Sequence, residues 1–142
     1  MLQYLQLEPE AQLPNIAALN PFQAVVIIEA KVSADWQFLV SGWLVASGCV
    51  YMMAWGHDCS SWDDSVDLAN IVRFDNCEVP DGKSVMTTWH EKEPLNEVFW
   101  FSHYCTFHPV LTIENTLLLH ISTENKEKEF VAAYTEAKDN HD

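Results

Sequence analysis

Basic side chains are scarce in this chain of 142 residues. Lysine and arginine together number seven, whereas aspartate and glutamate number 21, which leaves a formal net charge of −14. A surface of this kind repels phosphate backbones and anionic lipids, so we expect neither a nucleic acid nor a membrane as partner. It attracts and steers a basic protein partner instead. Acidity also serves solubility alone, and that second interpretation stays open.

Long apolar runs are also missing. No stretch approaches the roughly 18 unbroken apolar residues of a membrane span. The N-terminal residues MLQYLQLEPEAQ show no basic region followed by an apolar one, so no signal peptide is expected. We therefore predict a cytoplasmic protein with reduced thiols. The four cysteines contain no CxxC spacing, which argues against a disulfide framework or a zinc knuckle; they are Cys49, Cys59, Cys77 and Cys105.

Glycine occurs only four times, at positions 42, 48, 56 and 82. The chain accordingly lacks GxGxxG and GxxxxGK[ST], the glycine-rich loops that cradle nucleotide phosphates. With Arg73 as the single arginine, a nucleotide-binding role is disfavoured. The GxSxG motif of α/β-hydrolases is absent as well.

Short apolar runs do occur, and they alternate with segments of helical periodicity. AVVIIEA and CVYMMAW are rich in β-branched or apolar residues without polar alternation, which is typical of strands buried on both faces. Ser33 and Gly48 are suitable as the first and last caps of the helix between them. Ser60 or Ser61 is expected to begin the next helix, with Asp63 or Asp64 in a partial capping box. We expect strands at 24–30, 49–55, 84–89 and 116–122, and helices at about 34–47, 60–74, 94–106 and 125–138.

This alternation predicts an α/β fold, a three-layer α/β/α sandwich with a mostly parallel sheet of four strands. Two strand orders remain open, the flavodoxin-like order 2-1-3-4 and the Rossmann-like order 3-2-1-4. Residues 1–142 are expected to form one domain. In it, residues 1–23 are a proline-punctuated lead-in with a short helical turn at 13–19, and residues 139–142 a frayed tail.

Three segments resemble those of a small uncharacterised bacterial α/β family. They are PFQAVVIIEA, AWGHDCSSWDDSVD and TTWHEKEP…VFWF, and the resemblance extends over about residues 20–122. What it implies is a bacterial context and a domain of unknown function. It implies no activity, cofactor or site residue.

The carboxyl edge of the predicted sheet is where an open α/β fold binds its ligands. Order 3-2-1-4 makes the second and third strands neighbours and brings their trailing residues together. His57, Asp58 and His90, with Glu91, then form a candidate metal site, because imidazole and carboxylate ligands suit zinc or a similar divalent ion that activates water. The structural alternative is a solvated His57, an Asp58 that caps a turn, and a His90–Glu91 pair that leads into a helix.

Order 2-1-3-4 predicts a different crevice, between the first and third strands. Glu29, Lys31, Thr88 and His90 would face one another there, and a glutamate beside a histidine performs general acid–base chemistry. The competing interpretation pairs Glu29 with Lys31 or with backbone donors. The candidate catalytic residues are therefore Glu29, His57, His90 and Glu91.

Two further patterns are weaker. Cys59 lies near a helix N-terminus, where a thiolate is stabilised, but neighbouring aspartates oppose that thiolate. His103 and Cys105 point about 200° apart on a helix of 3.6 residues per turn, so they are not expected to share a metal with His108.

Tryptophan is frequent, with six copies. Trp36, Trp62 and Trp89 lie near the predicted carboxyl edge, with Asp63 and Asp64 beside them. If exposed, these residues form an aromatic patch ringed by acids, which is a good anchor for a protein partner. The alternative is that the tryptophans close the top of the core.

These observations favour an acidic, non-enzymatic protein-binding module. Its concrete form is an immunity-type or inhibitor protein that neutralises a basic bacterial toxin or effector. The alternative is a small metal-binding protein or hydrolase-like enzyme with a His/carboxylate site at the carboxyl edge. No cofactor is expected beyond a divalent metal in that alternative, and the oligomeric state stays open.

Overall fold

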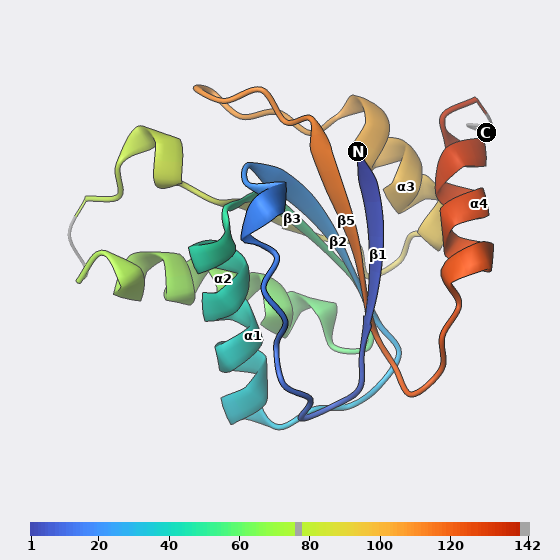
Figure 1. Cartoon of the computed structure of the whole chain (residues 1–142), viewed down its shortest axis with the longest axis horizontal. Helices are drawn as coiled ribbons and strands as arrows, with labels where there is room; N and C mark the ends of the chain where they lie inside the picture. The colour runs from blue at the N-terminus through green and yellow to red at the C-terminus, as the bar shows by residue number, and fades with distance from the viewer. Residues whose placement is uncertain (76–77, 140–142) are drawn as a thin grey trace.

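The computed structural model describes residues 1–75 and 78–139. Its sheet has five parallel strands in the order β1-β5-β2-β3-β4, with α-helices in the connections (Figure 1). The strands are β1 (Leu2–Leu7), β2 (Phe22–Ile28), β3 (Cys49–Gly56), β4 (Met86–Trp89) and β5 (Asn115–Ile121). The helices are α1 (Ala34–Ser47), α2 (Cys59–Arg73), α3 (Leu95–Tyr104) and α4 (Glu127–Ala137).

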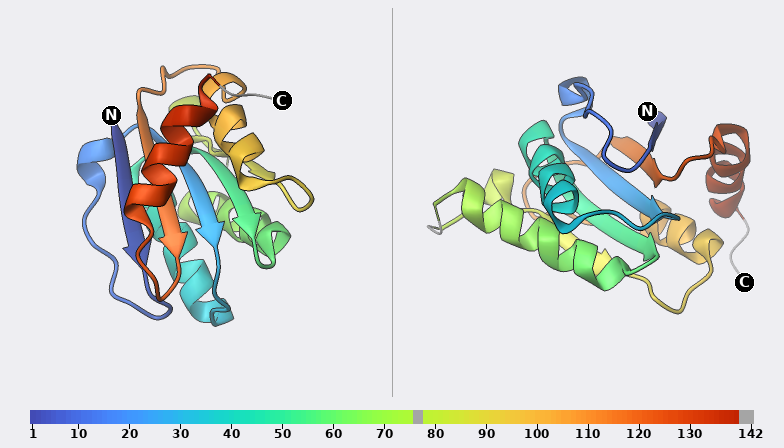
Figure 2. Two further views of the ribbon diagram at one scale, coloured as in Figure 1. Left: turned by 90° about the vertical axis from the view of Figure 1, so that its right-hand side faces the viewer. Right: turned by 90° about the horizontal axis from the view of Figure 1, so that it is seen from below.

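Helices cover both faces of the sheet (Figure 2). Alternate residues of a strand point to opposite faces, and β2 follows this rule. Val26 and Ile28 belong to the core cluster that includes residues of α1 and α2, whereas Val25 and Ile27 belong to the cluster with residues of α3 and α4. Every residue of β2 is buried, which confirms the interpretation of its unbroken apolar run.

The first strand, β1, corrects the predicted count of four strands. It pairs in parallel with β5 from Leu2↔Thr116 to Leu7↔Ile121. The prolines at 9, 14 and 21 predict a lead-in over residues 1–23, but residues 2–7 contain none of them and form a strand. The predicted turn at 13–19 does contain a short 3-10 helix, Ala17–Leu19.

The strand order distinguishes the two topologies left open by the sequence. The four predicted strands lie in the Rossmann-like order 3-2-1-4, which is β4-β3-β2-β5 here, so the flavodoxin-like order is wrong. Helices α1 and α2 lie on the same face of the sheet, so each of the strands β3 and β4 is added on the same side of the strand before it. The chain then returns through α3 on the other face and places β5 between β2 and β1.

Helix α1 begins and ends where the sequence predicts. The Ser33 side chain accepts a hydrogen bond from the Trp36 backbone N–H at 3.2 Å. Gly48 ends the helix with φ 106°, in the left-handed region that glycine adopts readily. A Cβ at Gly48 would lie 2.3 Å from the Asn20 side chain, so this close approach also requires glycine.

Helix α2 begins one residue earlier than predicted. Its N-cap position is Asp58, with φ 51°, and no side chain caps the first turn, so the predicted capping box is wrong. The Ser61 hydroxyl instead donates to the Asp58 backbone and side-chain oxygens at 2.8 and 2.9 Å. In α4 the N-cap position is Lys126, without a side-chain cap, and Asn125 Oδ1 just before it accepts from the Glu127 N–H at 3.0 Å.

Some predictions fall partly or wholly beyond the described residues. Cys77 is one, and the predicted frayed tail is another, since only Asp139 of that tail is described. Within the described ranges, Cys49, Cys59 and Cys105 are free thiols. No helix in those ranges is long and apolar enough to cross a membrane.

Candidate functional site

The carboxyl ends of the five strands meet at one edge of the sheet, as in any parallel sheet. The topological switch point of this edge lies between β2 and β5, because the chain leaves β2 toward α1 on one face and leaves β5 toward α4 on the other. Ligand sites of open α/β folds favour such a point. Three regions are described in turn. The switch point and a notch between β2 and β3 lie at the carboxyl edge, and the third region is the outer side of β4, the last strand of the sheet.

A continuous chain of hydrogen bonds fills the switch point. The Tyr4 hydroxyl lies 2.7 Å from His120 Nδ1, and His120 Nε2 lies 2.6 Å from Glu29 Oε1. Lys126 closes the chain at both ends, because its backbone N–H donates to the Tyr4 oxygen at 3.0 Å and its Nζ donates to Glu29 at 3.2 Å. A carboxylate only accepts, so His120 carries its proton on Nε2 and Nδ1 accepts from Tyr4.

The electrostatics of this network follow from its pairing. Burial alone raises the pKa of the Glu29 carboxyl, but the hydrogen bonds from His120 and Lys126 outweigh it and lower the pKa below its ordinary value. Burial raises the pKa of the Tyr4 hydroxyl. The His120 side chain is fully buried, with both ring nitrogens engaged. The network therefore ties β1, β2, β5 and the start of α4 together.

Sequence reasoning identified only Glu29 in this network. Tyr4 was missed because β1 was missed, and Lys126 because it lies in a loop whose partner is 97 positions away. His120 did carry a signal, as a lone polar ring in the apolar run TLLLHIS. Buried polar groups require partners, so that histidine predicted a partner on a neighbouring strand.

The predicted crevice between Glu29, Lys31, Thr88 and His90 does not form. It required β2 and β4 to be neighbours, and β3 lies between them. Glu29 is engaged by His120 and Lys126 on the β5 side.

The candidate metal ligands are not brought together either, although β3 and β4 are neighbours as that prediction needed. His90 is buried, and its two ring nitrogens lie 2.9 Å from the Thr88 hydroxyl and 3.2 Å from Glu93 Oε1. His57 lines the β2–β3 notch with Asp58. In residues 1–75 and 78–139, no three His, Cys, Asp or Glu side chains are arranged to hold a metal ion.

The remaining histidines and cysteines have separate neighbours. His103 Nε2 lies 2.7 Å from the Tyr134 carbonyl, and His108 is buried, with Nε2 3.1 Å from the Ser84 carbonyl. Cys105 is exposed. Burial, and the negative charges of Glu91 and Asp58, raise the pKa of the Cys59 thiol, which opposes the nucleophilic thiolate considered from the sequence.

The predicted aromatic patch is reduced to one tryptophan. Trp36 and Trp62 are only 4% and 1% exposed and belong to the core, whereas Trp89 is 52% exposed. Trp36 and Trp62 are buried because they lie on the sheet-facing sides of α1 and α2. Of the predicted acids, Asp63 is buried and Asp64 is exposed.

Trp89 lies at an open edge of the sheet, since β4 pairs only with β3. The His90 N–H donates to the Ala54 carbonyl, so by the alternation of strand hydrogen bonds the backbone groups of Thr87 and Trp89 point outward. None of the described residues pairs with those groups. On the same side, the Thr87 hydroxyl donates to Asp67 of α2 at 2.9 Å. We call Asp63, Asp67, Thr87 and Trp89 the β4 edge surface.

Asp63 is the unusual member of this surface. It is 5% exposed, and its Oδ2 has no hydrogen-bond partner among the described residues. Burial raises the pKa of this carboxyl, and the negative charge of Asp67 one helical turn away raises it further. A buried carboxylate oxygen without a donor is costly, so the site favours a cationic or hydrogen-bond-donating group at this position.

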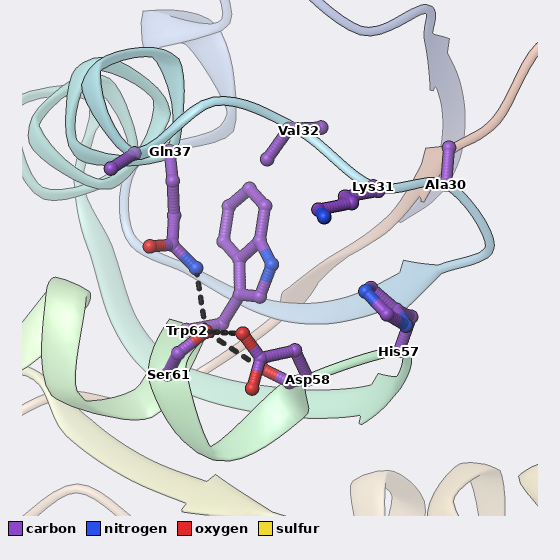
Figure 3. A pocket seen from close by; sticks show the side chains of 9 residues that line it. Ala30, Lys31, Val32, Gln37, His57, Asp58, Ser61 and Trp62 are labelled. Carbon is purple, nitrogen blue, oxygen red and sulfur yellow. Dashed lines mark hydrogen bonds between the residues drawn. The ribbon is translucent and has the colours of Figure 1, made fainter.

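The notch between β2 and β3 has a volume of about 170 Å³ (Figure 3). Lys31 and Val32 from the β2–α1 connection form one wall, and His57, Ser61 and Trp62 form the other. The notch lies next to the first turn of α2, the positive end of the helix dipole.

Comparison with known proteins places the sequence in a family context. A family model described as a domain of unknown function (DUF7684) matches residues 2–137, from β1 through α4. No curated protein and no solved structure matches the chain. The match confirms the resemblance to an uncharacterised family and supplies no activity.

Proposed function

Because the chain belongs to the DUF7684 family, whose description assigns no activity, we propose a function from the geometry alone: it is a protein-binding module that takes a basic extended segment along the β4 edge. The observation that carries this proposal is the free outer side of β4. Its outward backbone groups at Thr87 and Trp89 have no partner among residues 1–75 and 78–139, and an edge strand in that state is a template for another strand.

The side chains beside this edge favour a basic partner. Trp89 is half exposed, and large aromatic residues are common binding hot spots. The exposed Asp67 carboxylate lies on the α2 side of the strand, where a lysine or arginine of an added strand would reach it. Asp63 is buried behind it and adds negative charge at this place. The net charge of −14 steers such a partner toward the protein.

The concrete form of the proposal is an immunity-type or inhibitor protein. It would occupy the bacterial cytoplasm and neutralise a basic toxin or effector by covering part of it. An acidic surface with one aromatic anchor suits fast, salt-sensitive capture of a cationic protein.

A peptide titration tests this function. The probe is a synthetic peptide of alternating lysine and valine, compared with its glutamate–valine counterpart, by isothermal titration calorimetry at low and at physiological salt. We expect the lysine peptide alone to bind, less tightly at higher salt. Trp89→Ala and Asp67→Asn should each weaken binding about tenfold.

Leu39→Ala is the matched control, because Leu39 is 59% exposed on α1, outside the β4 edge surface. It should bind like the wild type. Equal binding of both peptides, or equal loss in Leu39→Ala and Trp89→Ala, would contradict the proposal.

A second candidate rests on the His120–Glu29 pair, a histidine–carboxylate contact of 2.6 Å at the carboxyl edge. Such a pair serves general acid–base catalysis in a small hydrolase-like enzyme. It ranks second because His120 is fully buried and both of its nitrogens are already bonded. Hydrolysis of nitrophenyl esters by the wild type and its loss in Glu29→Gln would support it.

A further inference from the structure

We propose that the notch between the carboxyl ends of β2 and β3 binds a small carboxylate, held by the Lys31 ammonium and the Trp62 indole N–H. This notch is separate from the β4 edge surface. Binding of a ligand in the notch does not depend on binding of a protein partner at β4. The ligand is a short aliphatic acid.

The indole N–H of Trp62 is the observation that points to a ligand. Trp62 is 1% exposed, and no described residue accepts a hydrogen bond from its indole N–H; this nitrogen is not among the buried atoms without a partner, so it opens onto the notch. Three other tryptophans each donate to a backbone carbonyl: Trp36 to Ala11, Trp43 to Pro14 and Trp55 to Glu93. An indole N–H normally finds an acceptor, and at the notch this one is open to an acceptor from outside the chain. Figure 3 shows the Trp62 indole nitrogen on the side of the ring that faces Lys31.

Lys31 supplies the charge. It follows β2 and points into the notch (Figure 3), and it forms no ion pair with a described carboxylate. Lys31 shares the lack of a carboxylate partner with other lysines of the described residues, but it lies beside an indole N–H donor that opens onto the same notch. His57 lies on the opposite wall. An oxyanion between them would satisfy both donors at once.

The first turn of α2 adds to the same preference. Backbone N–H groups and the helix dipole favour a negative charge at this end of a helix. Asp58 is the one carboxylate that lines the notch, and it is engaged by the Ser61 hydroxyl, which also accepts from Gln37 Nε2 at 2.9 Å. This relay holds the Asp58 carboxylate on the α2 side of the notch, as Figure 3 shows.

The size of the notch limits the ligand. Its volume of about 170 Å³ is below the roughly 300–1,000 Å³ of sites for drug-sized molecules. A carboxylate has two oxygens, one for the ammonium and one for the indole N–H. Val32 and Ala30 provide a short apolar wall for an alkyl group. Propionate has this combination, and propionamide is its uncharged analogue.

The test follows the Trp62 indole resonance by NMR in a ¹⁵N-labelled protein during titration with propionate at constant ionic strength. Trp62→Phe assigns the resonance and removes the donor together with the five-membered ring of the indole. Lys31→Gln removes the charge at a solvent-accessible position, so it leaves the core intact. Lys92→Gln is the matched control, because Lys92 is an exposed lysine outside the notch.

We expect propionate to shift the Trp62 indole resonance saturably, and propionamide to have little effect. Lys31→Gln should weaken binding about tenfold, the usual loss for a charge-assisted hydrogen bond, and Lys92→Gln should leave it unchanged. An unshifted resonance, an equal response to propionamide, equal affinity in Lys31→Gln, or binding of inorganic phosphate in place of propionate would overturn the proposal. Since Lys31→Gln and Trp62→Phe remove different donors, a folding defect in the second variant leaves the first decisive.

Discussion

Glu29 and Asp63 are two carboxylates near the same edge of one sheet, and their surroundings are opposite. Glu29 accepts hydrogen bonds from a buried histidine and from a lysine, and its pKa is lowered. Asp63 has an oxygen without a partner in the part of the chain that the structure describes, it has an aspartate for a neighbour, and its pKa is raised by burial and by that aspartate. The first therefore stabilises the fold in its charged form, and the second opposes the fold in that form.

This difference separates polar groups that stabilise the fold from polar groups that are available for binding. The switch point, where ligands of such folds are expected, is closed by its own side chains. Within the described residues, open groups lie elsewhere: the outer side of β4 is unpaired, Asp63 Oδ2 is buried without a partner, and the Trp62 N–H faces the β2–β3 notch. Buried polar groups are normally paired, so these are the positions that we propose a partner or a ligand completes; Gln23 Oε1 of β2, the other buried described atom without a partner, lies at neither place. Stability lost at such positions is a common consequence of function.

The largest expected effect comes from breaking the switch-point network. His120→Leu should lower the free energy of unfolding by about 3 kcal/mol, because it removes the acceptor of the Tyr4 hydroxyl and one of the two donors to Glu29 Oε1 from a buried position. Urea denaturation measures this loss. His57→Leu, at an exposed histidine of the same edge, should change stability by less than about 0.5 kcal/mol. If His120→Leu lowered the free energy of unfolding by less than about 1 kcal/mol, the network would not be important for the stability of the fold.

A smaller effect is expected from Glu29→Gln, with a characteristic pH dependence. The folded pKa of Glu29 lies below its unfolded value, so its contribution is present above the unfolded pKa and is lost as pH falls through the folded pKa. The variant should be about 1 kcal/mol less stable at neutral pH, a value reduced by solvent screening. The difference from the wild type should shrink on acidification. Denaturation curves between neutral pH and about pH 3 measure it.

The opposite sign is expected at Asp63. Its folded pKa lies above its unfolded value, so the stabilising contribution of the protonated form is complete below the unfolded pKa and is lost as pH rises through the folded pKa. Asp63→Asn should therefore stabilise the protein at neutral pH by about 0.5 kcal/mol, and weaken binding of the lysine–valine peptide. Asp64→Asn, at an exposed neighbour, is the control. Lower stability in Asp63→Asn at neutral pH would show that the carboxylate is well solvated or paired.

Local rules predicted much of the fold. The Ser33 and Gly48 caps set the bounds of α1, and unbroken apolar runs located β2, β3 and β5. The edge strand β1 was missed because its half-exposed sequence LQYLQL has no such run and depends on β5 for its pairing. Strand order was left open because helix faces, not local patterns, decide it.

The candidate site was harder to predict, because burial and pairing arise from tertiary contacts. Trp62 and Trp89 are the same residue type and both lie near strand ends in the sequence, yet Trp62 is in the core and Trp89 is half exposed. His120 and Glu29 are 91 positions apart in sequence and meet only through the β2–β5 pairing. The carboxyl-edge rule did place Glu29, His57 and Lys31 at the right end of the sheet.

The central claim is that β4 is an open strand that a basic partner completes, and amide hydrogen exchange tests it most directly. In the free protein, the outward backbone amides of Thr87 and Trp89 should exchange fast, while that of Thr88, which points toward β3, should be protected. With the lysine–valine peptide bound, the amides of Thr87 and Trp89 should become protected and that of Thr88 should change little. Peptide binding that leaves the Thr87 and Trp89 amides unprotected would contradict the account.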